Sequence, residues 1–246
     1  MQERSPLERA IAMVRDLRAR CPWDRAQTRE TLRPYLLEEV HELDQAIGDR
    51  DPTAIRREVG DLLLHLAWQL VLGADAHEFT PDDVATDLEA KMKRRHPHLY
   101  DLGPQESWEV LKRREGAGGV LAGLPPNLPA LLMAYRLGER AAAVGFDWPG
   151  VEGPVEKVRE ELGEVEQALG GDRNALEHEI GDLLFAVVNV ARKVGVVPGP
   201  ALARANQRFR SRFEGVERLA ERRGVSVPDA GLEVLDQLWE EVKTAT

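Results

Sequence analysis

The segment "PYLLEEVHELDQAIGDRDPTAIRREVGDLLLHLAWQL", residues 34–70, is the part of the sequence that decides the fold. Apolar residues recur in it three and four positions apart, from Leu36 to Ile47 and again from Ile55 to Leu66. This spacing predicts two amphipathic helices, and the short segment between them lets the helices run antiparallel. The β-branched residues elsewhere lack the alternation typical of strands, so the sequence predicts an all-α fold.

Acidic residues lie beside the apolar stripe of each predicted helix. At about 100° per residue, the stripes consist of Leu36, Val40, Leu43 and Ile47, and of Ile55, Val59, Leu62 and Leu66. The carboxylates at their flanks are those of Glu39, Glu42, Glu58 and Asp61. We expect the hairpin to bring these four groups together, where mutual repulsion would raise their pKa values unless a cation neutralised them. Ligands that are all oxygen atoms suit Mg²⁺, with Mn²⁺ as an alternative.

The second half of the chain repeats this arrangement. Residues 158–169, "VREELGEVEQAL", align with residues 36–47, and residues 176–187, "LEHEIGDLLFAV", align with residues 55–66. The second set of carboxylates consists of Glu161, Glu164, Glu179 and Asp182. One such set is common on a solvated helix surface, but two sets at matching positions indicate duplication of a metal-binding helical unit.

A segment rich in glycine and proline, residues 116–130 ("GAGGVLAGLPPNLPA"), separates the two repeats. This composition is typical of a linker between domains. The sequence therefore predicts an N-terminal helical domain over residues 1–115 and a C-terminal one over residues 131–246.

Basic residues and a tryptophan follow the acidic segments of the second half. Arg208 and Arg212 are one helical turn apart, as are Trp239 and Lys243. Beside a metal site, these side chains would suit a polyphosphate that carries a flat base. Their counterparts in the first half are Lys91, Arg95, Trp108 and Lys112.

The composition excludes several classes of protein. A net charge of −10 argues against a nucleic-acid polymer as partner, because phosphate backbones are held by surplus lysine and arginine. The single cysteine, Cys21, excludes an internal disulfide bond and favours a reducing compartment. The first residues contain no apolar signal core, and no apolar run reaches the length of a membrane span. We therefore expect a soluble cytoplasmic protein.

Four further motifs resemble those of the MazG family of all-α nucleoside triphosphate pyrophosphohydrolases. They are "CPWDRAQT" at 21–28, "RRHPHLY" at 94–100, "GFDW" at 145–148 and "NQRFRSRF" at 206–213. The resemblance covers nearly the entire chain and implies two tandem MazG-like domains, whose four-helix sites are completed by formation of a homodimer. It also implies Mg²⁺-dependent hydrolysis of nucleoside triphosphates between the α and β phosphates, which yields nucleoside monophosphate and pyrophosphate.

The resemblance also implies roles for individual residues. The metal ligands of the C-terminal half would be Glu161, Glu164, Glu179 and Asp182. The nucleotide contacts would be Lys157, Glu160, Arg208, Arg212, Trp239 and Lys243. The chain departs from the family at Arg208, where lysine is frequent, and at Ala175, where a basic residue is common. Glu160 and Glu164 are the candidates for the general base, and we expect broad base specificity and a role in control of the nucleotide pool.

Two other functions remain open at this point. A di-iron carboxylate bundle uses a Glu-x-x-His motif, which Glu38 and His41 match, but the second repeat has Gly163 in place of the histidine. A helical scaffold that senses nucleotides without catalysis is the other alternative. If the protein is an enzyme, we expect the C-terminal repeat to dominate, because paired arginines hold phosphate oxygens better than a lysine does. His65, which has no counterpart in that repeat, is expected to be a hydrogen-bonded core residue.

Overall fold

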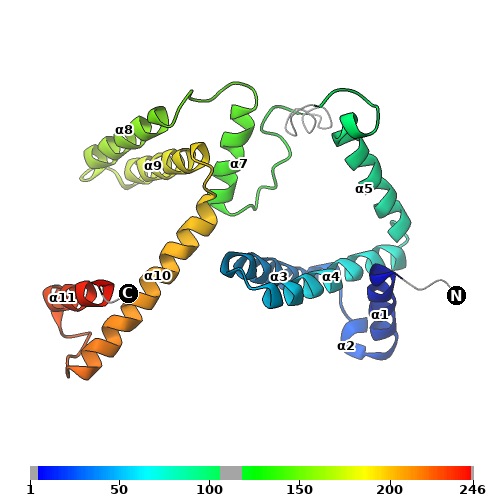
Figure 1. Cartoon of the computed structure of the whole chain (residues 1–246), viewed down its shortest axis with the longest axis horizontal. Coiled ribbons are helices and arrows are strands. Elements are labelled where there is room, and N and C mark those ends of the chain that lie inside the picture. The colour runs from blue at the N-terminus through cyan, green and yellow to red at the C-terminus, as the bar shows by residue number, and fades with distance from the viewer. Residues whose placement is uncertain (1–4, 106–117, 245–246) are drawn as a thin grey trace. The chain divides into compact units, whose positions relative to one another are not determined.

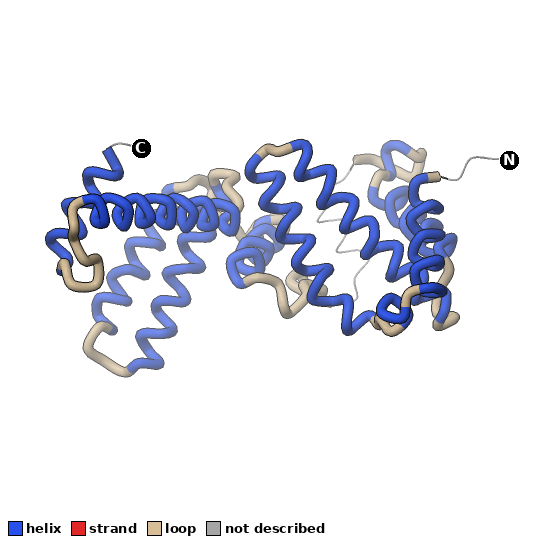
Figure 2. Tube along the Cα trace, turned by 90° about the horizontal axis from the view of Figure 1, so that it is seen from below, coloured by secondary structure: helices blue, strands red, loops and turns tan. Residues whose placement is uncertain are grey.

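A computed structural model describes residues 5–105 and 118–244. These residues form helices and connecting loops and contain no strand, so the predicted all-α fold is confirmed (Figure 2). The chain divides into two compact units, Met1–Glu106 and Ser107–Thr246. The predicted domain limits stay a prediction, because the first residues of the proposed linker lie outside the described part of the chain. Among the described residues, no helix has both the length and the apolar character needed to cross a membrane.

The N-terminal unit is built around one long helical hairpin (Figure 1). Its elements are α1 (Pro6–Arg20), α2 (Pro22–Arg25), α3 (Arg29–Asp49), α4 (Pro52–Asp75), α5 (Pro81–Arg95) and the 3₁₀ helix η1 (Pro97–Leu99). Arg50 ends α3 in the left-handed conformation, and the Asp51 side chain then accepts hydrogen bonds from the backbone N–H groups of Thr53 and Ala54. These caps turn the chain within two residues, so α3 and α4 pack side by side.

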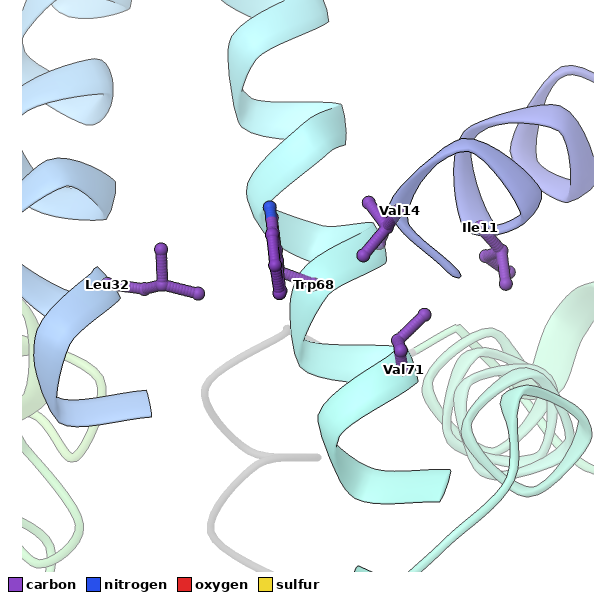
Figure 3. Packing of buried hydrophobic residues seen from close by; sticks show 6 residues of the cluster. Ile11, Val14, Leu32, Trp68 and Val71 are labelled. Carbon is purple, nitrogen blue, oxygen red and sulfur yellow. The ribbon is translucent and has the colours of Figure 1, made fainter. Parts of the chain in front are cut away.

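The apolar core of this unit lies at the end of α4 that is remote from the hairpin turn. Trp68 and Val71 of α4 pack there with Val14 of α1 and Leu32 of α3 (Figure 3). Trp68 is almost fully buried, and the guanidinium group of Arg18 lies over its ring, 5.4 Å from the centroid. This core fixes α3 and α4 at one end and leaves the acidic segments in the middle of the hairpin.

The C-terminal unit contains a second hairpin of the same kind (Figure 1). Its helices are α7 (Ala130–Ala142), α8 (Glu152–Ala168), α9 (Arg173–Lys193), α10 (Pro198–Arg222) and α11 (Gly231–Thr244). Helices α8 and α9 form the hairpin, and α7 packs against α9. The two helices α7 and α9 approach closely at Gly138, where a Cβ atom would lie 2.8 Å from Nε of Arg192. Helix α11 packs on α10 around Val216, Ala220 and Leu238.

The predicted apolar stripes are only partly buried within the chain. Val40 and Ile47 remain about half exposed, whereas Ala46 is buried and Glu39 is half-buried. The side of α3 that faces α4 therefore includes the acidic residue, and part of the apolar stripe points away. The same rotation occurs in α4, α8 and α9, where the exposed stripe residues are Val59, Leu66, Leu162, Leu169, Ile180 and Val187.

Candidate metal and nucleotide site

Three carboxylates meet in the seam between α3 and α4. Glu39 of α3 and Glu58 and Asp61 of α4 each place an oxygen within 4.8 Å of the others. Glu58 is only 2% exposed. Burial raises the pKa of Glu39, and the charges of Asp61, Glu42 and Glu58 raise it further. Glu42, the fourth predicted ligand, is exposed and lies outside the group of three, although its charge acts on Glu39.

The corresponding carboxylates meet in the seam between α8 and α9. Glu161 and Glu164 of α8 lie with Glu179 of α9, again with oxygens within 4.8 Å of one another. Loss of hydration raises the pKa of Glu164, the charges of Glu161 and Glu179 add to this shift, and Lys157 opposes it. Asp182, the fourth predicted ligand, is not in this group; it lies 3.3 Å from Nε2 of His178 on its own helix.

The local sequence explains why the two clusters form. In α8, Val158, Glu161, Val165 and Ala168 are three or four residues apart and therefore lie on one side of the helix. All four are at least partly buried, with Glu161 only 4% exposed. A carboxylate thus takes a position that an apolar residue would occupy in an ordinary helix seam. Burying such a group carries a cost that only a partner of opposite charge offsets.

Each cluster contains one basic side chain that belongs to the same hairpin. In the N-terminal unit, Nε and Nη2 of Arg57 donate to Oε1 of Glu58 at 2.9 and 2.6 Å. In the C-terminal unit, Nζ of Lys157 lies 2.7 Å from Oε1 of Glu161 and donates to Oε1 of Glu160 at 2.8 Å. Lys157 was expected at this site as a nucleotide contact, whereas Arg57 was missed. The sequence did contain a signal for Arg57, because this residue directly precedes Glu58, an acid whose spacing places it in the seam.

The donor groups of the C-terminal cluster fit a divalent cation that prefers oxygen ligands. Oε2 of Glu161 is buried and has no hydrogen-bond partner among the described residues. An orphaned buried carboxylate oxygen beside two further carboxylates is the arrangement that a bound cation satisfies. Glu38 and His41, which the di-iron alternative requires, are both exposed, and neither joins the N-terminal cluster. The three grouped ligands of each described cluster are therefore all carboxylates.

The remaining predicted nucleotide contacts lie on α10 and α11. Arg208 and Arg212 lie on α10, and no hydrogen bond or ion pair among the described residues joins them to the cluster. Lys243 instead donates to Glu240, and Trp239 packs against Phe209 with 5.2 Å between the ring centroids. Trp239 is thus part of the small core between α10 and α11. In the N-terminal unit, Trp108 and Lys112 lie outside the described residues.

His65 distinguishes the two hairpins. It is buried in the seam of α4, as expected of a core residue, and its counterpart Ala186 is also buried. Nδ1 of His65 is buried without a hydrogen-bond partner in the described part of the chain, so the expected hydrogen bond is not found at this nitrogen. Burial lowers the pKa of the imidazole, against a smaller opposite effect of Asp61. The N-terminal cluster is therefore flanked by a neutral ring at neutral pH, and the C-terminal cluster by a methyl group.

Comparison with known proteins shows which family the chain resembles. Residues 27–100 match the MazG nucleotide pyrophosphohydrolase domain. The chain is 39% identical to the nucleoside triphosphate pyrophosphohydrolase/pyrophosphatase MazG of Thermotoga maritima, over 96% of this chain and 95% of that protein. It is 38% identical to the nucleoside triphosphate pyrophosphohydrolase of Escherichia coli, over 94% and 93% of the two chains. It is also 40% identical to the uncharacterized protein YabN of Bacillus subtilis, over 94% of this chain and half of that protein.

Proposed function

The chain belongs to the MazG nucleotide pyrophosphohydrolase family, and from this premise we propose that it hydrolyses nucleoside triphosphates between the α and β phosphates. The products are nucleoside monophosphate and pyrophosphate, and the reaction requires Mg²⁺. The observation that carries the proposal is the group formed by Glu161, Glu164 and Glu179, in which one buried carboxylate oxygen has no partner. Such a group is costly in a folded protein without a cation and useful with one.

In this proposal the C-terminal cluster is the catalytic metal site. Glu161, Glu164 and Glu179 would hold the metal ion, and Asp182, which lies beside His178 on the same helix, would be the fourth ligand. When bound, Mg²⁺ supplies positive charge that offsets the charge of the phosphate oxygens and favours ionisation of water. The N-terminal carboxylates Glu39, Glu42, Glu58 and Asp61 form a second metal site.

Glu164 is the better of the two candidates for the general base. It is the exposed member of the carboxylate group, so one of its oxygens is open to a water molecule while the group holds the metal ion. Glu160 lies outside the carboxylate group and accepts a hydrogen bond from Lys157. We therefore assign Glu160 the role of orienting Lys157, whose ammonium group binds the triphosphate.

The remaining nucleotide contacts require a second subunit in this proposal. Arg208, Arg212 and Lys243 bind phosphate oxygens and Trp239 stacks on the base, although no hydrogen bond or ion pair among the described residues joins them to the acid cluster of their own chain. The outer face of the α8–α9 hairpin is apolar and uncovered within the chain; its exposed residues are Leu162, Leu169, Ile180, Leu184 and Val187. A homodimer that packs these faces together would bury them and complete a four-helix site.

Substrate choice follows from the same groups. The charged side chains act on the triphosphate, which every nucleoside triphosphate carries, so we propose broad base specificity and a role in control of the nucleotide pool. An indole ring that stacks on a base adds affinity with little selectivity, because every base has an aromatic face.

Product analysis tests the proposal directly. The full-length protein is incubated with each common nucleoside triphosphate and Mg²⁺, and the phosphorus products are identified by ³¹P NMR spectroscopy. Monophosphate and pyrophosphate are expected, and EDTA should abolish the reaction. A chain with Glu179→Gln and Asp182→Asn serves as the matched control for contaminating phosphatases. Diphosphate and orthophosphate as first products would contradict the proposed cleavage position.

A further inference from the structure

The two acid clusters take their basic side chain from opposite helices of the hairpin. Lys157 comes from α8, the first helix of its hairpin, and Arg57 comes from α4, the second helix of its hairpin. In the aligned repeats, the position of Lys157 is held by Tyr35 and the position of Arg57 by His178. The basic side chain therefore comes from a different position in each repeat, and the two clusters can differ in their response to metal ions.

Arg57 binds the N-terminal cluster at Glu58, the most buried of its carboxylates. Two N–H groups of the guanidinium converge on Oε1 of Glu58, whose side chain is 3% exposed. The guanidinium also lies within electrostatic range of Glu42 and Asp61. One cation thus acts on three of the four predicted ligands, and it competes directly with a metal ion for Oε1 of Glu58.

In the C-terminal cluster the basic side chain makes one contact with the buried glutamate, where Arg57 makes two. Lys157 contacts Oε1 of Glu161 and leaves Oε2 of the same carboxylate buried without a partner among the described residues. A ligand atom is therefore open to a metal ion while the lysine stays in place. Lys157 also donates to Glu160, outside the group of three carboxylates, so its charge is shared with a residue that the metal ion does not need.

We propose that Arg57 is the resident counter-ion of the N-terminal acid cluster, and that it weakens the binding of a divalent metal ion there by its positive charge and by competing for Oε1 of Glu58. The inference rests on the metal binding proposed above. Arg57 is able to move, since its side chain is 72% exposed. It also lines a cavity of about 360 Å³ together with Asp49 and Asp51, so other carboxylates are at hand for the displaced guanidinium. The N-terminal repeat is then the cluster of lower metal affinity, which fills after the catalytic one.

Mn²⁺ binding to full-length variants tests this inference, with the EPR signal of free Mn²⁺ as the readout. Glu164→Gln with Glu179→Gln removes the C-terminal cluster and leaves the N-terminal one for titration. In this background, Arg57→Gln removes the counter-ion and Arg57→Lys keeps the charge with fewer hydrogen bonds. Arg56→Gln is the matched control, because it makes the same change of charge at a neighbouring exposed residue. A chain with Glu39→Gln and Asp61→Asn retains only the C-terminal cluster and serves as the reference.

Arg57→Gln should raise the Mn²⁺ affinity of the N-terminal cluster about tenfold, the scale of one charge-assisted hydrogen-bonded pair. Arg57→Lys should raise it less, and Arg56→Gln should leave it nearly unchanged. Unchanged affinity in both Arg57 variants, or an equal gain in Arg56→Gln, would overturn the inference. If circular dichroism shows that Arg57→Gln unfolds the unit, Arg57→Lys decides the outcome alone. Failure of the reference chain to bind Mn²⁺ would instead contradict the proposed function itself.

Discussion

Asp147 joins the loop between α7 and α8 to the last turn of α9, and its replacement by asparagine should destabilise the C-terminal unit. Nη1 and Nη2 of Arg192 donate to the two carboxylate oxygens at 3.1 and 2.5 Å, and Nζ of Lys193 donates at 2.9 Å. Lys193 also donates to the backbone carbonyl of Trp148. These bonds hold the start of α8 against α9, and thereby place Glu161 and Glu164 opposite Glu179.

The size of the effect follows from burial. The side chain of Arg192 is 9% exposed, so the asparagine variant leaves a nearly buried guanidinium without its countercharge. Breaking a fully buried ion pair costs about 3–5 kcal/mol. Asp147 and Lys193 keep 19% and 17% exposure, so we expect about 2–3 kcal/mol in the free energy of unfolding. At about 3 °C per kcal/mol for a unit of this size, Tm should fall by about 6–9 °C.

The same contacts predict a pH dependence. Hydrogen bonds from Arg192 and then Lys193 hold the pKa of Asp147 well below its usual range, although burial opposes them. A depressed folded-state pKa stabilises the fold at pH values above the unfolded-state pKa of about 3.9. This contribution is lost as the pH falls through the folded-state pKa. The difference between wild type and Asp147→Asn should therefore be complete at pH 7 and should shrink below about pH 4.

Differential scanning calorimetry of the full chain measures the effect. Glu241→Gln is the matched control, because Glu241 accepts two hydrogen bonds from Arg223 at 2.8 and 2.7 Å in the same unit. Both of those side chains are about half exposed, so the control should lower Tm much less. If Asp147→Asn shifts the transition no more than Glu241→Gln, the reasoning from burial is refuted.

Three further predictions concern the proposed function. Glu179→Gln should lower kcat at least about a hundredfold under saturating Mg²⁺, whereas Glu58→Gln should leave most activity intact. Equal losses of kcat in steady-state assays of the two variants would show that both repeats catalyse or are coupled. Mg²⁺ should raise Tm more at pH 7.5 than at pH 5. Without metal, the raised pKa values of Glu39 and Glu164 stabilise the folded state at acidic pH, and this stabilisation is lost as the pH rises through those pKa values. A bound Mg²⁺ therefore has more repulsion to offset at pH 7.5. Calorimetric shifts of equal size at the two pH values would contradict this. Leu184→Glu, on the uncovered face of α9, should convert a dimer into a folded monomer in light scattering, and an unchanged mass would place the dimer interface elsewhere.

The periodicity of the sequence by itself determined the helices, the hairpins and the duplication. Helix geometry relates residues three and four apart without reference to the rest of the fold, so the spacing of Glu161 and Glu164 sufficed to place both on neighbouring positions of one helix. The turns were equally local, because Asp51 and Asp172 cap the following helices through contacts within three residues. The pairing of carboxylates from two helices was also predictable, since a short turn leaves the helices antiparallel.

Only the tertiary structure decided which side of each helix faces its partner. Successive residues differ by about 100° around a helix, so a modest rotation about its axis exchanges one set of buried residues for another. The rotation found here half-buries Glu39 and exposes Val40, and it leaves Glu42 and Asp182 outside their groups of three carboxylates. The burial of individual acids was equally beyond the pattern: Glu58 and Glu161 are the buried carboxylates of their clusters, and Arg57 and Lys157 bind them from the same helix. That burial depends on distances across the seam, which the spacing of residues along one helix does not contain.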